Sequence, residues 1–138
     1  MPRLFLLAFS LMLFSGVSYA NSIPDLSALE DKTDSEFLSV DKAFLPDVKR
    51  TDAGWVVRFD IADHYYLYRD RFMLKNPQDK LHFVQTAELK QDKNFGAVMV
   101  FHHRVDVEVY AAAEGASLLT YQGCSEDGLC YPPQTLFL

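Results

Sequence analysis

The two cysteines of this 138-residue chain stand close together near its end, as Cys124 and Cys130. The five residues between them begin with the turn formers Ser-Glu-Asp-Gly, so we expect the chain to fold back and place both thiols on neighbouring antiparallel strands. Facing residues of such strands have Cα atoms about 4.5 to 5.5 Å apart, within the range of about 4.4 to 6.8 Å that a disulfide needs. The spacing therefore predicts a pair that can form a disulfide bond.

A structural bridge is the alternative interpretation of the same pair. On the loop-closure model, a bridge that closes about seven residues removes only about 2.4 kcal/mol of unfolded-chain entropy, against about 4.4 kcal/mol for the span of about 70 residues between immunoglobulin sheets. The short bridge would therefore stabilise the fold only weakly. A redox pair needs Cys130 to be reachable at the surface, whereas a structural bridge would be buried and inert.

The spacing of the histidines disfavours a metal site. A closed site needs about four Cys or His ligands, and the histidines show no ligand-like spacing to the cysteines. The histidines are His64, His82, His102 and His103. The chain also has no Cys-x-x-Cys motif, so it is not itself thioredoxin-like. We expect neither a metal nor a cofactor other than the cysteine pair.

Residues 1–20 have the pattern of a secretory signal peptide. Arg3 gives a positive start, residues 4–14 are apolar apart from one serine, and Ser18 and Ala20 are the small residues of a cleavage site. The apolar run is shorter than the roughly 20 residues that span a bilayer, so we predict cleavage after Ala20. The remainder is enough for one domain, located outside the cytoplasm where disulfides persist.

The charge of the chain limits its partners. The net charge is −6, and removal of Arg3 with the signal peptide would make it more negative. An acidic surface disfavours nucleic acid and anionic lipid as partners.

Short stretches of alternating polarity predict an all-β fold. Apolar residues alternate with polar ones in 55–61 and again in 105–109. Further strands are expected at 37–44, 65–74, 81–86, 97–101, 117–122 and 129–138, with turns at 46–47, 53–54, 76–77 and 114–115. Residues 21–36 are polar and are predicted to be a lead-in segment with little core to bury. Seven or so short strands predict a two-sheet antiparallel sandwich.

Two segments do not fit a plain sandwich. The run Tyr65-Tyr66-Leu67-Tyr68-Arg69 is aromatic on both strand faces, so one face must meet solvent or another segment; tyrosines that cap the sandwich edge are the simpler alternative. Residues 88–96 are polar up to Phe95 and Gly96, and we expect them to form a loop that covers something.

Four sequence blocks give the chain a family resemblance. In order they are Val40-Asp41-Lys42-Ala43-Phe44, the tyrosine run 65–69, the loop 92–96, and Tyr121-Gln122-Gly123-Cys124 followed after five residues by Cys130-Tyr131-Pro132-Pro133. The last block is the specific one. With these blocks, the chain resembles the N-terminal periplasmic domain of the thiol:disulfide interchange protein DsbD.

The resemblance implies an immunoglobulin-like antiparallel β-sandwich with an inserted cap loop over residues 37–138. It also implies a periplasmic protein-disulfide reductase that takes electrons from a thioredoxin-like domain. The electrons would pass to periplasmic disulfide isomerases and cytochrome c maturation thioredoxins. By position, Cys130 matches the cysteine that forms the mixed disulfide, and Cys124 matches its resolving partner. Any membrane contact would be indirect, through the membrane domain into which the family protein normally continues.

The resemblance also implies a cap loop that shields the cysteine pair. The cap residues are Asp92, Lys93, Asn94, Phe95 and Gly96, and the tyrosines expected around the pair are Tyr66, Tyr68 and Tyr131. Asn94 stands where the family usually has an aromatic residue, so we expect Phe95 to shield the sulfurs instead. The acidic residues Glu126, Asp127 and Asp92 are expected to hold back thiolate formation by like-charge repulsion.

The competing function is a secreted immunoglobulin-like binding module with a structural hairpin disulfide. The two functions differ in the accessibility of Cys130 and in the reduction potential of the pair. A value well below about −300 mV would place the pair with structural disulfides.

Overall fold

The computed structural model describes residues 36–111 and 115–138, which belong to one compact unit. The predicted signal peptide, all but the last residue of the predicted lead-in segment, and part of the predicted turn at 114–115 lie outside the described residues. No helix in these described ranges is long and apolar enough to cross a membrane.

The described chain consists mainly of β-strands, with one short α-helix and one turn of 3₁₀ helix. In chain order the elements are α1 (Val40–Ala43), β1 (Phe44–Thr51), β2 (Gly54–Ile61), β3 (Tyr65–Tyr68), η2 (Arg69–Arg71), β4 (Met73–Leu74), β5 (Lys80–Phe83), β6 (Glu88–Asp92), β7 (Gly96–Phe101), β8 (Arg104–Tyr110), β9 (Leu118–Tyr121), β10 (Gly123–Ser125) and β11 (Gln134–Phe137).

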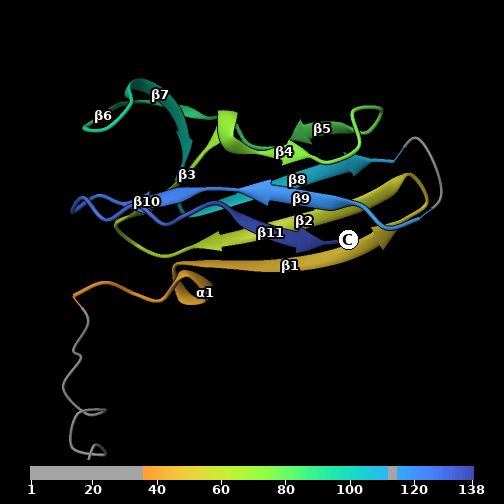
Figure 1. The fold of residues 1–138 in the computed structure, drawn as a ribbon, viewed down its shortest axis with the longest axis horizontal. Coiled ribbons are helices and arrows are strands. Elements are labelled where there is room, and N and C mark those ends of the chain that lie inside the picture. Colours follow the sequence, from red (N-terminus) through yellow and green to blue (C-terminus); the bar gives the residue numbers. More distant parts are fainter. Residues whose placement is uncertain (1–35, 112–114) are drawn as a thin grey trace, which may run out of the picture. The chain divides into compact units, whose positions relative to one another are not determined.

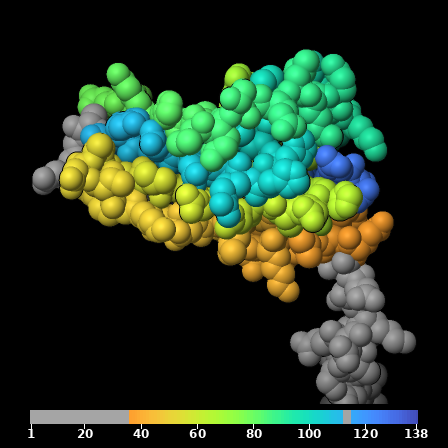
Figure 2. Space-filling view, turned by 180° about the vertical axis from the view of Figure 1, so that it is seen from behind, coloured from red at the N-terminus to blue at the C-terminus, as the bar shows by residue number. Residues whose placement is uncertain are grey.

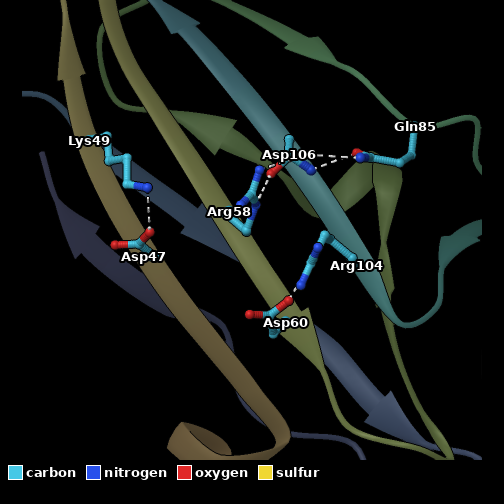
Figure 3. Close-up of polar contacts among 7 residues, drawn as sticks. All are labelled: Asp47, Lys49, Arg58, Asp60, Gln85, Arg104 and Asp106. Atoms are coloured by element: carbon cyan, nitrogen blue, oxygen red, sulfur yellow. Dashed lines mark hydrogen bonds and ion pairs between the residues drawn. The ribbon is translucent and has the colours of Figure 1, made fainter.

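The first layer is a four-stranded sheet in the order β1-β2-β8-β5. Its central strands confirm the predicted alternation, because Val57 and Phe59 of β2 and Val105 and Val107 of β8 are fully buried. Their polar neighbours form the outer face (Figure 3), where Arg58 of β2 contacts Asp106 of β8 at 2.7 Å. Cross-strand pairs of this kind help to fix the register of the sheet.

The second layer comprises the sheets β11-β9-β4 and β10-β3-β7-β6, and the two are continuous in the chain. β9 runs into β10 across Gln122, and β3 runs into β4 across η2. The Tyr68 amide donates to the Gln122 carbonyl at 3.0 Å where both strands are interrupted. All ladders are antiparallel. The predicted all-β, immunoglobulin-like antiparallel sandwich is therefore confirmed.

The alternation along β3 separates two apolar clusters. Tyr65 and Leu67 point into the main core between the layers. Tyr66 and Tyr68 point to the opposite face, where they form a second cluster with Val100 and the sulfur-bearing side chain of Cys124. As expected for a run that is aromatic on both faces, the outer face of β3 is covered by another segment.

Two predictions near the start of the domain were wrong. Residues 37–44 were expected to be a strand, but the amides of Lys42 and Ala43 donate to the Ser39 carbonyl and close the turn of α1. The expected turn at 46–47 lies inside β1, where Pro46 faces Phe59. Proline is tolerated there because β1 is an edge strand that pairs only with β2.

The loop predicted at 88–96 is a β-hairpin. β6 and β7 pair from Glu88 opposite Val100 to Asp92 opposite Gly96, so only Lys93 to Phe95 form the turn. The polar composition of β6 hid this strand, because it lies at a sheet edge where both faces of most of its residues meet solvent. Two further predicted strands are shorter than expected. The strand at 65–74 is interrupted by η2, and the strand at 129–138 begins only after Pro132 and Pro133.

The elements that carry the resemblance blocks gather at one end of the domain. Figure 1 places β10, the hairpin β6–β7 and α1 at the same end. In the view from behind (Figure 2), the C-terminal part of the chain, in blue, lies between the blue-green β6–β7 hairpin and the orange start of the domain. A functional site built on Cys124 therefore lies at an end of the sandwich.

Gly123 is a position where the fold leaves no room for a side chain. A Cβ there would overlap the Tyr66 carbonyl oxygen and come within 2.5 Å of the Phe44 ring. We therefore expect Gly123→Ala to lower the free energy of unfolding by about 3 kcal/mol through overpacking, measured by urea denaturation of the oxidised domain.

Gly96 provides the matched control for this substitution. Its φ is +72° and a Cβ there would meet nothing within 4 Å, so Gly96→Asn should cost about 1 kcal/mol or less. Equal losses of stability in the two variants would contradict the proposed crowding at Gly123.

Candidate functional site

Cys124 and Cys130 form a disulfide with their Cα atoms 4.0 Å apart. Cys124 lies in β10 opposite Tyr66, and Cys130 faces Cys124 in an isolated antiparallel bridge. The predicted fold-back of the chain is therefore confirmed. Cys124 is fully buried, whereas Cys130 is partly exposed. Of the two cysteines, Cys130 is therefore the more accessible from solvent.

The turn between the cysteines is closed by its own backbone. The Ser125 amide donates to the Leu129 carbonyl at 2.7 Å, and the Gly128 amide donates back to the Ser125 carbonyl at 3.1 Å. Gly128 has a φ of 106°, which only glycine adopts without cost. The Ser125 hydroxyl also accepts a bond from the Asp127 amide at 3.1 Å. These bonds hold the two strands in register around the disulfide.

Tyr131 is next to Cys130 in the chain, but its ring points away from the sulfurs. Its described partners are the Phe44 ring, at a centroid distance of 5.6 Å, and the Tyr65 ring at 6.2 Å. Its hydroxyl donates to the Leu38 carbonyl oxygen. Tyr131 thus anchors the segment after Cys130 to the main core.

Asp92 is the centre of the polar network beneath the disulfide. One carboxylate oxygen accepts bonds from the hydroxyls of Tyr66 at 2.6 Å and Tyr68 at 2.7 Å. The other accepts the backbone amides of Asn94 at 2.7 Å and Phe95 at 3.0 Å. Asp92 is only 7% exposed. The same side chain therefore shapes the cap turn and orients both tyrosines.

These contacts set the protonation states of the network. Burial opposes ionisation of Asp92, but the bonds from Tyr66, Tyr68 and the two cap amides outweigh it and lower the pKa of Asp92 to about 2. Burial, followed by the bond to Asp92, raises the pKa of Tyr66 to about 12. The same two causes raise the pKa of Tyr68. At neutral pH the site therefore holds one carboxylate and two neutral phenols.

The Tyr68 hydroxyl connects this network to the cysteines. Its oxygen lies 3.0 Å from Cys124 Sγ and 4.0 Å from Cys130 Sγ. Its single proton goes to the Asp92 carboxylate, the strongest acceptor present, so the phenol oxygen faces the sulfur as an acceptor. A disulfide sulfur has no proton to give, whereas a reduced Cys124 has one. The site is therefore arranged to accept a hydrogen bond from the Cys124 thiol once the disulfide opens.

The cap turn approaches the disulfide through two side chains. The Asn94 amide group donates to Cys130 Sγ at 3.2 Å. The Phe95 ring, 45% exposed, packs edge-on against Tyr68 at 5.4 Å and lies under the Arg71 guanidinium at 4.6 Å. Phe95 therefore reaches the site through Tyr68, and Asn94 makes the described cap contact with a sulfur.

Most of the residues predicted for the site meet in one place. The contacts above link Cys124, Cys130, Tyr66, Tyr68, Asp92, Asn94 and Phe95. Lys93 lies in the turn without such a contact, Gly96 begins β7, and Tyr131 faces the core. Sequence reasoning placed Asp92 in the cap as a repelling charge and missed its role as acceptor for both tyrosines. The alternation that puts Tyr66 and Tyr68 on one strand face was the available signal.

Within residues 36–111 and 115–138, no group of three or more His, Cys, Asp or Glu side chains is placed to hold a metal ion.

An antiparallel sandwich that holds one half-exposed disulfide under a hairpin turn defines an immunoglobulin-like domain with a disulfide suited to exchange. The family model described as "Thiol:disulfide interchange protein DsbD, N-terminal" matches residues 34–138. This chain belongs to that family of DsbD N-terminal domains.

The curated relatives are much longer proteins. The thiol:disulfide interchange protein DsbD of Pseudomonas fluorescens is 41% identical over 138 residues, a match that covers 99% of this chain and 22% of the relative. DsbD 1 of Pseudomonas aeruginosa is 45% identical over 108 residues, covering 72% of this chain and 18% of the relative. The chain thus spans about one fifth of the length of these relatives.

Solved structures of similar domains come from Neisseria meningitidis. The reduced DsbD N-terminal domain is 38% identical with a TM-score of 0.65, and the match covers 74% of this chain and 87% of the other. A complex between the DsbD N-terminal and PilB N-terminal domains gives 40% identity and a TM-score of 0.62, with coverages of 75% and 86%.

The low pKa of Asp92 predicts a pH-dependent contribution to stability. Because its pKa falls from the ordinary 3.8 to about 2 on folding, its contribution is present above pH 4 and is lost as the pH falls toward 2. Asp92→Asn should therefore reduce the acid-induced loss of unfolding free energy between pH 4 and 2 by about 2 kcal/mol.

Urea denaturation of both oxidised proteins across this range measures the difference. Asp106, whose pKa is also lowered, is present in both proteins and cancels. Identical pH slopes for wild type and Asp92→Asn would contradict the network described for Asp92.

Proposed function

We propose that this domain performs thiol–disulfide exchange in the periplasm, passing reducing equivalents from a thioredoxin-like domain to disulfide-containing partners through Cys124 and Cys130. One observation carries the proposal: Cys130 is partly exposed, while Cys124 is fully buried with its sulfur 3.0 Å from the Tyr68 hydroxyl. Attack needs one reachable sulfur, and resolution needs a second within reach of the first.

The reaction with an acceptor has two steps. The Cys130 thiolate attacks one sulfur of the partner disulfide; the partner S–S bond breaks, a mixed disulfide forms and the other partner sulfur leaves as a thiolate. Cys124 then attacks Cys130 Sγ and expels the second partner thiolate. The proton of the Cys124 thiol ends on that departing thiolate. The domain loses two electrons and the partner gains them.

The Tyr68 hydroxyl supports a division of labour between the sulfurs. A reduced Cys124 that donates to Tyr68 is held as a neutral thiol, because the bond favours the protonated form. Cys124 therefore stays a poor nucleophile until Cys130 has formed the mixed disulfide, from which the partner thiolate can leave. Reduction by the thioredoxin-like donor follows the same steps in reverse.

The proposed partners are thioredoxin-like proteins: the donor domain, periplasmic disulfide isomerases and cytochrome c maturation thioredoxins. The family resemblance supports this set, and so does the solved complex between the DsbD N-terminal and PilB N-terminal domains of Neisseria meningitidis. The periplasmic location rests on the signal-peptide pattern of residues 1–20. The partial exposure of Cys130 weighs against the binding module with an inert bridge.

Removal of the resolving sulfur should trap a partner. We expect Cys124→Ser to accumulate a mixed disulfide between Cys130 and a thioredoxin-like partner, because the attacking thiol remains and the second step is blocked. Non-reducing electrophoresis and mass spectrometry of alkylated extracts would identify the adduct.

Cys130→Ser is the matched control, since it leaves only the buried sulfur and should trap far less. Equal trapping by the two variants, or the reverse order, would show that the roles of Cys124 and Cys130 are wrongly assigned.

We also propose that the cap slows oxidation of the reduced pair. Phe95→Ala should speed reaction of the reduced pair with a small disulfide oxidant several-fold, because the turn loses its packing on Tyr68 and Arg71. Asn94→Ala should have a smaller effect, since it removes one amide–sulfur bond. Stopped-flow kinetics measure both rates.

A thermal melt of each variant separates shielding from packing. An unchanged oxidation rate for Phe95→Ala would rule out shielding by Phe95, whatever the change in its melting temperature.

A further inference from the structure

The turn between the cysteines carries a carboxylate that is surrounded by basic groups from three other segments. Glu126 Oε1 lies 3.3 Å from His102 Nε2 and 3.7 Å from Lys90 Nζ, and its other oxygen lies 4.0 Å from His64 Nδ1. The Glu126 amide also donates to the His64 carbonyl at 2.8 Å. Glu126 is thus tied by its side chain and its backbone to residues outside the turn.

His102 is the most enclosed of these basic groups. Its side chain is 21% exposed, against 77% for His64. Its Nε2 is sealed from solvent and has no hydrogen bond, and the polar atom facing it is Glu126 Oε1 at 3.3 Å. On the other edge of the ring, Nδ1 lies 3.3 Å from Glu88 Oε2 of β6. The ring therefore lies between two carboxylates, one from the cysteine turn and one from the hairpin.

The backbone fixes His102 in this position. His102 directly follows β7, and the next residue, His103, has a φ of 61°. The Arg104 amide donates to the His102 carbonyl at 2.6 Å, which closes a tight reverse turn into β8. The His102 ring also packs 5.9 Å from the ring of Tyr66. The ring is therefore held between the cysteine turn and the hairpin that carries the cap.

We propose that His102 is a positioning residue for the exchange reaction: through Glu126, it holds the cysteine-bearing turn so that the two sulfurs stay within reach of each other when the disulfide is open. This proposal rests on the proposed function and deepens it. His102 touches neither sulfur in the structure and acts through Glu126.

The proposal fixes the sign of an effect on the reduction potential. A turn that is held in place gives the two thiols a high effective concentration for each other, which favours the disulfide. If the tie is lost, the reduced turn gains freedom, whereas the oxidised turn stays closed by the disulfide itself. This difference disfavours the disulfide, so the potential of the pair must rise.

The test compares reduction potentials in glutathione or dithiothreitol buffers for wild type, His102→Asn, Glu126→Gln and the double variant. We expect each single variant to lower the effective concentration of the thiols by about three- to tenfold, which raises the potential by about 15 to 30 mV. The double variant should match the single variants, because the two residues act as one unit.

The exposed neighbour His103 provides the control. Its ring lies 3.7 Å from Asp63 and is 82% exposed, and asparagine tolerates its positive φ, so His103→Asn should leave the potential unchanged. A thermal melt of each oxidised variant confirms that it is folded before its potential is measured.

Two results would overturn the proposal. One is an unchanged or lowered potential in folded His102→Asn. The other is a full His102→Asn effect in the Glu126→Gln background, which would mean that His102 acts on the sulfurs without Glu126. Trapping by Cys124→Ser is measured separately, so its failure would reject the proposed function rather than the role of His102.

Discussion

A buried carboxylate at the end of the sandwich is the constraint on which the site depends. Asp92 is nearly inaccessible to water, and an ionised group there is tolerated only because each of its oxygens accepts two hydrogen bonds. Two of the donors are backbone amides of the cap turn and two are phenols of β3. Cap, tyrosines and sulfurs are therefore not independent features. They are held in one arrangement by the need to satisfy a single charge.

This arrangement needs both faces of β3. The face that carries Leu67 is packed between the layers, and the face that carries Tyr66 and Tyr68 would lie open if the β6–β7 hairpin did not cover it. β7 attaches the hairpin by pairing with β3 and by burying Val100 against the tyrosines, and Asp92 and the packing of Phe95 fasten its turn. An immunoglobulin-like sandwich can host sulfur chemistry here because one of its strands is buried on both faces.

The features that follow from local periodicity could be predicted from the sequence. Alternation in β2 and β8, turn formers between the cysteines and the specific block around Cys124 were enough to predict the sandwich and the disulfide. The sequence of β6 shows no alternation of polar and apolar residues, because most side chains of this edge strand meet solvent whichever face they lie on. The four bonds to Asp92, and the pairing of Glu126 with His102, join residues far apart in the chain. No spacing rule encodes such contacts.

The absence of a side chain at Gly123 also protects β10 against mispairing. Successive residues of a strand face opposite sides, so a slip of one residue would turn Cys124 toward the sandwich and send its neighbour outward. The space under Gly123 is already filled by Phe44 and by the backbone of β3. A slipped strand would force a sulfur into occupied volume. The crowding thus disfavours the slipped pairing and favours the register that leaves Cys124 on the same face as the tyrosines.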